Sequence, residues 1–74
     1  MKMIRLNNGL WVRSEDVISL QVSAPYGGVG DWRLDVMVRS PGAAIGYYLV
    51  TSFWKTEAEV DHAALAIVAQ LNHA

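Results

Sequence analysis

The sequence contains no cysteine, which excludes disulfide bonds, cysteine-ligated zinc and thiol nucleophiles. Its two histidines, His62 and His73, cannot form a metal cage by themselves. Charged residues make up 18% of the chain, below the usual level of about a quarter, and the formal net charge is −1. This balance lacks both the basic footprint of a nucleic-acid binder and the acidic surplus of a DNA mimic. We therefore expect no metal, no cofactor and no direct binding of nucleic acid.

Long hydrophobic runs and targeting segments are also missing. The longest uncharged stretches, residues 17–30 and 40–54, contain Gly, Pro and Ser and are too short and polar to span a bilayer. At the N-terminus, Arg5, Asn7 and Asn8 interrupt any apolar segment of a signal peptide. We therefore expect a cytoplasmic protein that does not enter a membrane.

The length of 74 residues leaves room for a single domain, residues 1–74. A chain this short buries only about 60% of the surface it exposes when unfolded, so it usually needs a disulfide, a metal or a partner subunit. Hydrophobic residues make up 53% of the chain, which favours the partner subunit. We expect a homo-oligomer, with a two-fold dimer as the commonest form.

Alternating apolar and polar residues predict strands between about residues 3 and 54. Asn8-Gly9 provides the two positive-φ positions of a tight hairpin turn, which would pair residues 3–6 with 10–13. Further strands are expected over residues 18–23 and 32–39, separated by a loop rich in glycine.

The stretch 45–54 predicts a strand with apolar side chains on both faces, which indicates that both faces are covered. A single helix can cover only one of them. We expect Tyr48, Val50 and Trp54 to lie on the face left in water. Together with Trp11 and Leu65, they form the predicted subunit interface, because large aromatics are typical of interface centres. The alternative is that these side chains complete one small core.

Thr56-Glu57-Ala58-Glu59 has the spacing of a capping box and predicts a helix from about residue 57 to residue 72. The predicted fold class is therefore α+β: an antiparallel meander of four to five strands with one C-terminal helix packed on one face.

The loop around residues 24–31 offers the strongest candidate for a ligand site. Glycine backbones can approach a ligand closely, aromatic rings can stack on a planar group, and an arginine can hold a phosphate with two hydrogen bonds. The candidate residues are Tyr26, Gly27, Gly28, Trp32 and Arg33. The segment matches neither a dinucleotide-binding nor a P-loop motif. The alternative interpretation is a connection whose Trp32 enters the core.

Catalytic patterns are not evident. Asp61 and His62 are neighbours and point about 100° apart on a helix, so they cannot form a local dyad. We predict no catalytic residues and a protein that is not an enzyme.

The segment Ile4-Arg5-Leu6-Asn7-Asn8-Gly9-Leu10-Trp11-Val12-Arg13, followed by Glu15-Asp16-Val17, resembles the start of the flagellar FlbD-like proteins. The complete layout, a meander followed by a Thr-Glu-Ala-Glu-Val helix, resembles small phage-encoded accessory proteins. Two groups fit: oligomeric anti-defence proteins that sequester a cyclic-nucleotide signal, and anti-CRISPR proteins that block a nuclease by contact. The near-neutral charge differs from that of anti-CRISPR proteins that mimic DNA.

These observations predict a non-enzymatic, oligomeric binding protein that occupies a host protein partner, in the host cytoplasm if it is phage-encoded. The alternative is sequestration of a small nucleotide-like ligand by the glycine-rich loop with Tyr26, Trp32 and Arg33.

Overall fold

The computed structural model describes residues 2–40, 42 and 45–73. Within these residues, five strands and one helix follow one another, with one 3-10 turn before β3 and another before β4. Their bounds are β1 Met3–Arg5, β2 Trp11–Arg13, β3 Val17–Ser23, β4 Trp32–Arg39, β5 Tyr47–Trp54 and α1 Glu57–Asn72. The predicted α+β class and the C-terminal helix are confirmed.

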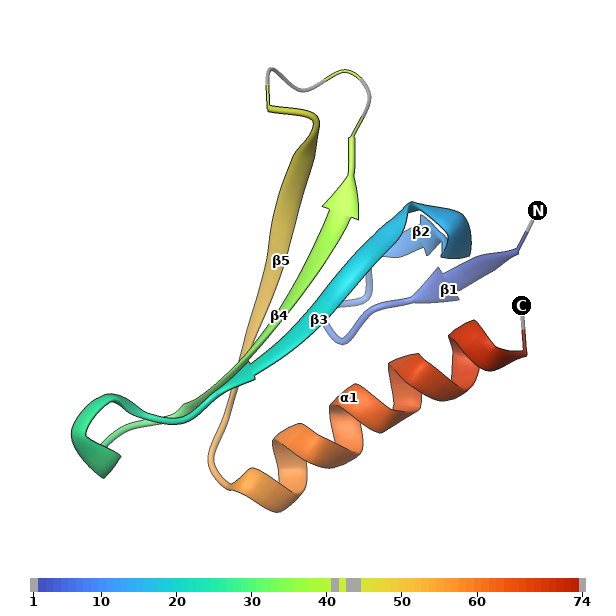
Figure 1. Ribbon diagram of the computed structural model, residues 1–74. Helices are drawn as coiled ribbons and strands as arrows, with labels where there is room; N and C mark the ends of the chain where they lie inside the picture. The colour runs from blue at the N-terminus through green and yellow to red at the C-terminus, as the bar shows by residue number, and fades with distance from the viewer. Residues whose placement is uncertain (1, 41, 43–44, 74) are drawn as a thin grey trace.

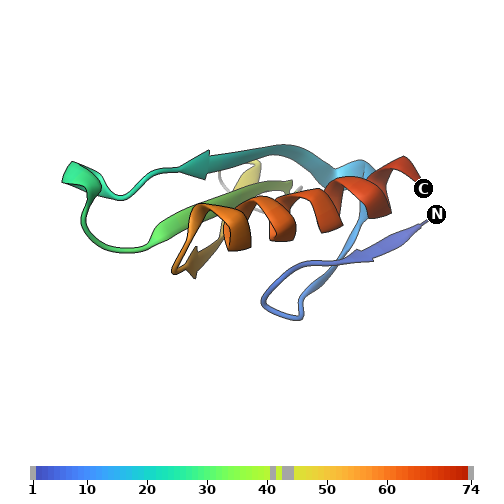
Figure 2. The ribbon, with the colours of Figure 1, turned by 90° about the horizontal axis from the view of Figure 1, so that it is seen from below.

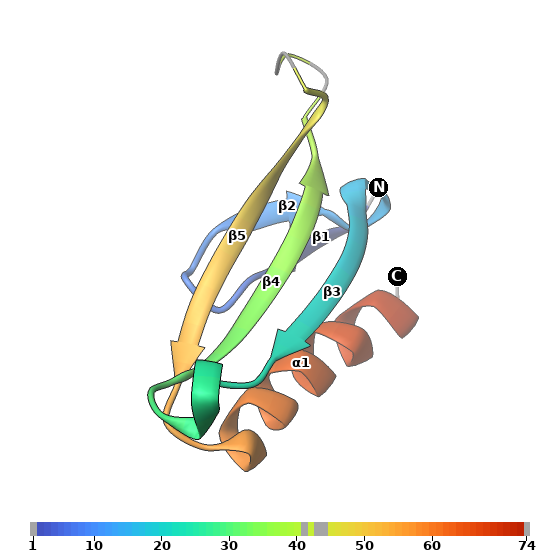
Figure 3. The same cartoon turned by 60° about the vertical axis from the view of Figure 1, so that its left-hand side comes forward.

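The strands form two antiparallel sheets rather than one continuous meander. β1 pairs with β2 in a short hairpin, and β3, β4 and β5 form a second sheet with β4 in its centre. The hairpin and α1 lie on the same side of the three-stranded sheet (Figures 1 and 2), and Figure 3 shows the strands β3–β5 in front of both. One face of the large sheet is thus covered and the other is not.

The core lies between the large sheet, the hairpin and the helix. Among the described residues it consists of nine buried hydrophobic side chains. Three come from β4, three from α1 and three from the hairpin, where one of them directly follows β1. They are Ile4, Leu6, Val12, Leu34, Val36, Val38, Val60, Ala63 and Ile67. On α1, the buried positions recur three and four residues apart, which is the spacing of a single helical face.

The hairpin turn differs from the predicted two-residue type. Among the described residues, no residue other than glycine has a positive φ, so Asn8 does not adopt the left-handed conformation; Gly9 alone does, at φ 87°. The loop closes through Gly9 N–H donating to the carbonyl of Leu6 and through Leu6 N–H donating to that of Leu10. The side-chain oxygen of Asn8 accepts from Leu10 N–H at 3.0 Å, an interaction that favours this three-residue loop.

The expectation about the covered face of β5 was wrong. Val36 lies opposite Val50, and Trp32 lies opposite Trp54, so the even-numbered residues of β5 share the face of β4 that meets the core. Val50 and Trp54 are partly buried and pack against the core. Both faces of this strand are apolar, so the sequence alternation separates two sets of residues without showing which one faces inward.

Helix α1 begins as the capping box predicts. Thr56 has extended backbone angles, and its hydroxyl oxygen accepts a hydrogen bond from Glu59 N–H at 3.2 Å. At the other end, the side-chain amide of Gln70 joins the helix to the hairpin: Arg5 N–H donates to Gln70 Oε1, and Gln70 Nε2 donates to the Arg5 carbonyl, both at 2.9 Å. No helix in the described part of the chain has the length and apolar character needed to cross a membrane.

We predict that Thr56→Ala lowers the free energy of unfolding by about 1 kcal/mol, because Glu59 N–H loses its acceptor. Thr56→Ser keeps the hydroxyl and should retain most of the stability. Urea unfolding followed by circular dichroism measures both. Equal stability of the alanine and serine variants would contradict the cap.

Candidate binding surface

The candidate site is the uncovered face of the three-stranded sheet, which we call the open face. It carries the side chains that alternate with the core residues of β3, β4 and β5, and the pairing register places them in rows across the sheet. The open face consists of Ser19, Gln21, Ser23, Arg33, Asp35, Met37, Arg39, Tyr47, Leu49, Thr51 and Phe53. No other described element covers it (Figure 3).

The open face is apolar along β5 and polar along β3. Leu49 and Phe53 are 52% and 65% exposed, and Tyr47 is 38% exposed. The partly buried Met37 lies opposite Leu49 and extends this apolar strip onto the central strand. Thr51 separates Leu49 from Phe53 along β5. Large apolar side chains that are grouped on one exposed face mark contact surfaces more often than scattered ones do.

A buried carboxylate lies at the centre of the open face. Asp35 is only 8% exposed although it points away from the core. Its Oδ1 accepts a hydrogen bond from the Thr51 hydroxyl at 2.7 Å, and its Oδ2 lies 3.0 Å from Nε of Arg33. Both oxygens are therefore engaged, and the network links β4 to β5 across the open face.

The second arginine of this face has a different environment. Arg39 lies at the end of β4 opposite Tyr47 and is exposed. Within the described residues, no carboxylate lies within 4 Å of it. Arg39 thus offers a positive charge beside an aromatic ring at one end of the apolar strip.

A cleft of about 330 Å³ opens at the other end of the open face. Ser23, Arg33 and Phe53 form its floor as neighbours across the three strands, and the loop after β3 contributes Ala24, Pro25, Tyr26 and Asp31. Tyr26 is fully exposed, and the Arg33 side chain is about half exposed, 49%, while paired with Asp35.

The structure brings only part of the predicted ligand set together. Tyr26 and Arg33 both line the cleft, whereas Trp32 packs against the core on the other face of β4. Adjacent residues of a strand point to opposite faces, so Trp32 and Arg33 cannot hold one ligand between them. Gly27 and Gly28 have φ values of 66° and 76° and form the turn that carries Tyr26, without lining the cleft.

The predicted interface residues are distributed over several parts of the molecule. Val50 and Trp54 pack against the core, and Tyr48 shares their face of β5 with 38% exposure. Trp11 is 57% exposed on the hairpin, and Leu65 is 65% exposed on the helix. The apolar residues that sequence reasoning left out of the interface, Tyr47, Leu49 and Phe53, are those on the open face. The strand over residues 32–39 is clearly amphipathic, so its apolar face can be assigned to the core. Pairing the predicted strand 45–54 with it could then have identified Tyr47, Leu49 and Phe53 as the residues that face away from the core.

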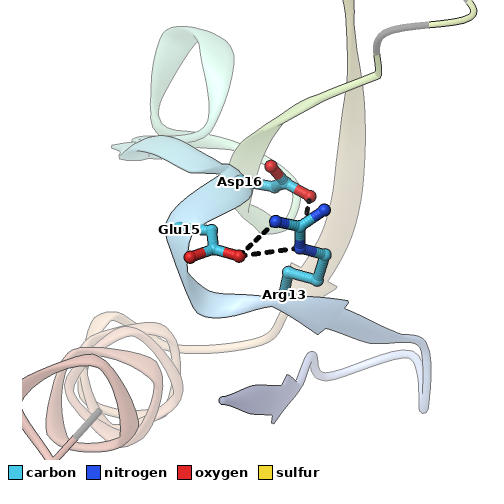
Figure 4. Close-up of polar contacts among 3 residues, drawn as sticks. All are labelled: Arg13, Glu15 and Asp16. Carbon is cyan, nitrogen blue, oxygen red and sulfur yellow. Dashed lines mark hydrogen bonds and ion pairs between the residues drawn. The ribbon is translucent and has the colours of Figure 1, made fainter. Parts of the chain in front are cut away.

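A charged cluster of Arg13, Glu15 and Asp16 lies in the turn between β2 and β3 (Figure 4). Arg13 Nε donates to Glu15 Oε1 at 2.8 Å and lies 3.7 Å from a carboxylate oxygen of Asp16. The hydrogen bond and the charge of Arg13 lower the pKa of Glu15, and Glu15 in turn raises the pKa of Arg13. Glu15 thus favours folding above its unfolded-state pKa, and this contribution disappears as the pH falls through its lower folded-state pKa. Both side chains are about half exposed, so water screens the pair, and we assign it to the turn.

Histidine and acidic residues are dispersed. Across residues 2–40, 42 and 45–73, no three His, Asp or Glu side chains gather closely enough to hold a metal ion. His62 and His73 are both exposed.

Comparison of the chain with protein-family models, with curated proteins and with solved structures gives no match.

We predict that Asp35→Ala destabilises the fold by about 1–3 kcal/mol, because the Thr51 hydroxyl loses its acceptor and the Arg33 guanidinium loses its ion-pair partner. Arg33 is half exposed and screened by water, so the Thr51 hydrogen bond should account for most of the loss. A double-mutant cycle of Asp35→Ala and Thr51→Val in urea unfolding measures this share. Additive effects of the two substitutions would contradict the coupling.

Proposed function

We propose that this protein acts by binding another protein through its open face, without catalysing a reaction. The observation that carries the proposal is the apolar strip of Tyr47, Leu49 and Phe53, which remains exposed while the opposite face of the sheet packs against the core. Burying apolar surface contributes about 25 cal/mol per Å², so contact with this strip should provide most of the binding free energy.

The charges of the open face indicate the chemistry of the partner. Asp35 is neutralised by Arg33, while Arg39 extends into solvent next to Tyr47. A complementary surface therefore combines apolar side chains with a carboxylate that reaches Arg39. Such a charge adds specificity and steers association more than it adds affinity.

The rigidity of the open face also supports this function. Its residues lie on strands, and the contacts of Asp35 with Thr51 and Arg33 fix the centre of the face before binding. A surface ordered in advance loses less conformational entropy when it binds.

Photo-cross-linking tests this proposal. A benzophenone amino acid in place of Met37 should form an adduct with a specific protein from cells that produce this chain. The adduct should disappear when Leu49 and Phe53 are both changed to serine or when Arg39→Glu reverses the charge. The matched control is Leu65→Ser on the helix, since Leu65 and Phe53 are equally exposed at 65%. Equal adduct yields from the control and the open-face variants would overturn the proposal.

The cleft supports a second candidate function, the binding of a small nucleotide-like ligand. Its volume of about 330 Å³ falls in the range of small-molecule sites, and Tyr26 and Arg33 offer a ring and a positive charge. A nucleotide bound at about 100 times its Kd stabilises a fold by roughly 2.7 kcal/mol.

We expect a thermal-shift screen of mononucleotides and cyclic nucleotides to detect such a ligand, and Tyr26→Ala to abolish the shift. Tyr26 is fully exposed, so this substitution leaves the fold intact. If the Tyr26→Ala variant shows the same shift in melting temperature as the wild type, the loop is not part of the site. If no nucleotide shifts the melting temperature of the wild type, this function is excluded.

A further inference from the structure

The outer edge of β5 is an unpaired edge of the three-stranded sheet in the described part of the chain. In the described part of the chain, β5 pairs with β4 on one side, and no strand lies along its other side. Figure 3 shows this edge at the side of the sheet away from the helix. At about 3.3 Å per residue, the eight residues of β5 expose an edge of roughly 26 Å.

The register shows which backbone groups point outward. Ser40 N–H donates to the Gly46 carbonyl at 2.9 Å, which makes residues 40 and 46 a hydrogen-bonded pair. Such pairs recur at every second residue of an antiparallel ladder, so residues 48, 50, 52 and 54 direct their N–H and C=O groups toward β4. The N–H and C=O groups of Tyr47, Leu49, Thr51 and Phe53 therefore point to the outer edge.

This edge has none of the features that usually prevent strands from pairing. β5 contains no charged residue, no proline and no glycine, and the structure gives it no bulge. The opposite edge of the sheet differs, because a register shift between Val17 and Ser19 interrupts β3. A bulge of this kind bends a strand and disfavours further pairing. An uncharged, regular edge fits an equally uncharged strand.

We propose that a second copy of the chain pairs with this edge, β5 against β5 in antiparallel orientation, about a two-fold axis through Val50. This register places Tyr47 opposite Phe53 of the second copy and Leu49 opposite Thr51 of the second copy. All four outward-pointing residues then exchange hydrogen bonds with the second copy. The two large sheets become one, and the two open faces lie side by side.

The side chains are compatible with this arrangement. The pairs of Tyr47 with Phe53 bring aromatic rings together on the open face, and such cross-strand pairs add to sheet stability. On the other face, Val50 lies against its own symmetry mate. No like charges meet along the strand, because none are present in residues 47–54. The proposal is independent of the function proposed above, since it concerns the protein without any partner.

Sedimentation of the purified chain with matched substitutions at Leu49 tests the edge. The wild-type chain should have twice its monomer mass at high micromolar concentration. Leu49→Pro should be a folded monomer, because proline removes an outward N–H that has no partner in β4. Leu49→Ala removes the side chain but keeps the N–H, and Leu65→Glu alters the helix, so both should remain dimeric. A monomeric wild type, or a dimer that persists in folded Leu49→Pro, would overturn the proposal.

Single cysteines test the register, because the chain has no cysteine of its own. Val50→Cys places two thiols at the axis, where paired Cα atoms lie about 4.5 Å apart, within the range of a disulfide. Leu49→Cys and Thr51→Cys place the thiols diagonally, about 7–8 Å apart, and should cross-link far more slowly. Faster cross-linking at Leu49→Cys or Thr51→Cys would overturn the register. If Val50→Cys does not fold, the double variant Tyr47→Cys/Phe53→Cys, which should link two chains by two bridges, replaces it.

Discussion

The alternation of side chains along β4 determines which side of the molecule is closed and which is open. β4 is the central strand of the large sheet, and its Leu34, Val36 and Val38 are almost completely buried. The helix and the hairpin both contact these side chains from one direction, and the described chain provides no further layer. The residues of β4 that alternate with Leu34, Val36 and Val38 therefore face away from the core.

Asp35 shows how an uncovered sheet face can hold a carboxylate that is nearly inaccessible to water. Its oxygens are engaged by Thr51 on the neighbouring strand and by Arg33 two residues away on its own strand. An unpaired carboxylate at this position would be costly, because burial of charge without hydrogen bonds is strongly unfavourable. The network keeps the polar centre of the face fixed, while the apolar side chains of β5 remain available for contact.

Local patterns were sufficient for the elements but not for their assembly. The capping box at Thr56 predicted a helix over residues 57–72, and the alternation over residues 32–39 predicted β4 with its bounds. Which face of β5 turns inward depends on pairing between distant residues, such as Val36 with Val50, and no local pattern encodes it. One feature of the ligand site could be predicted from the sequence: alternation along a strand places Trp32 and Arg33 on opposite faces of the sheet. The cleft around Tyr26 needed the fold, because it joins the loop to Phe53.

The amide of Gln70 that bonds to the backbone of Arg5 has a consequence for the order in which the molecule is made. The two residues are 65 positions apart, and the hairpin residues Ile4, Leu6 and Val12 belong to a core whose other members all follow them in the chain. At a synthesis rate of about 5–20 residues per second, Gln70 is added to the chain roughly 3–13 s after Arg5. The hairpin and the helix therefore complete the core only when nearly all of residues 2–73 have been made, so the fold forms as one unit at the end of synthesis rather than element by element.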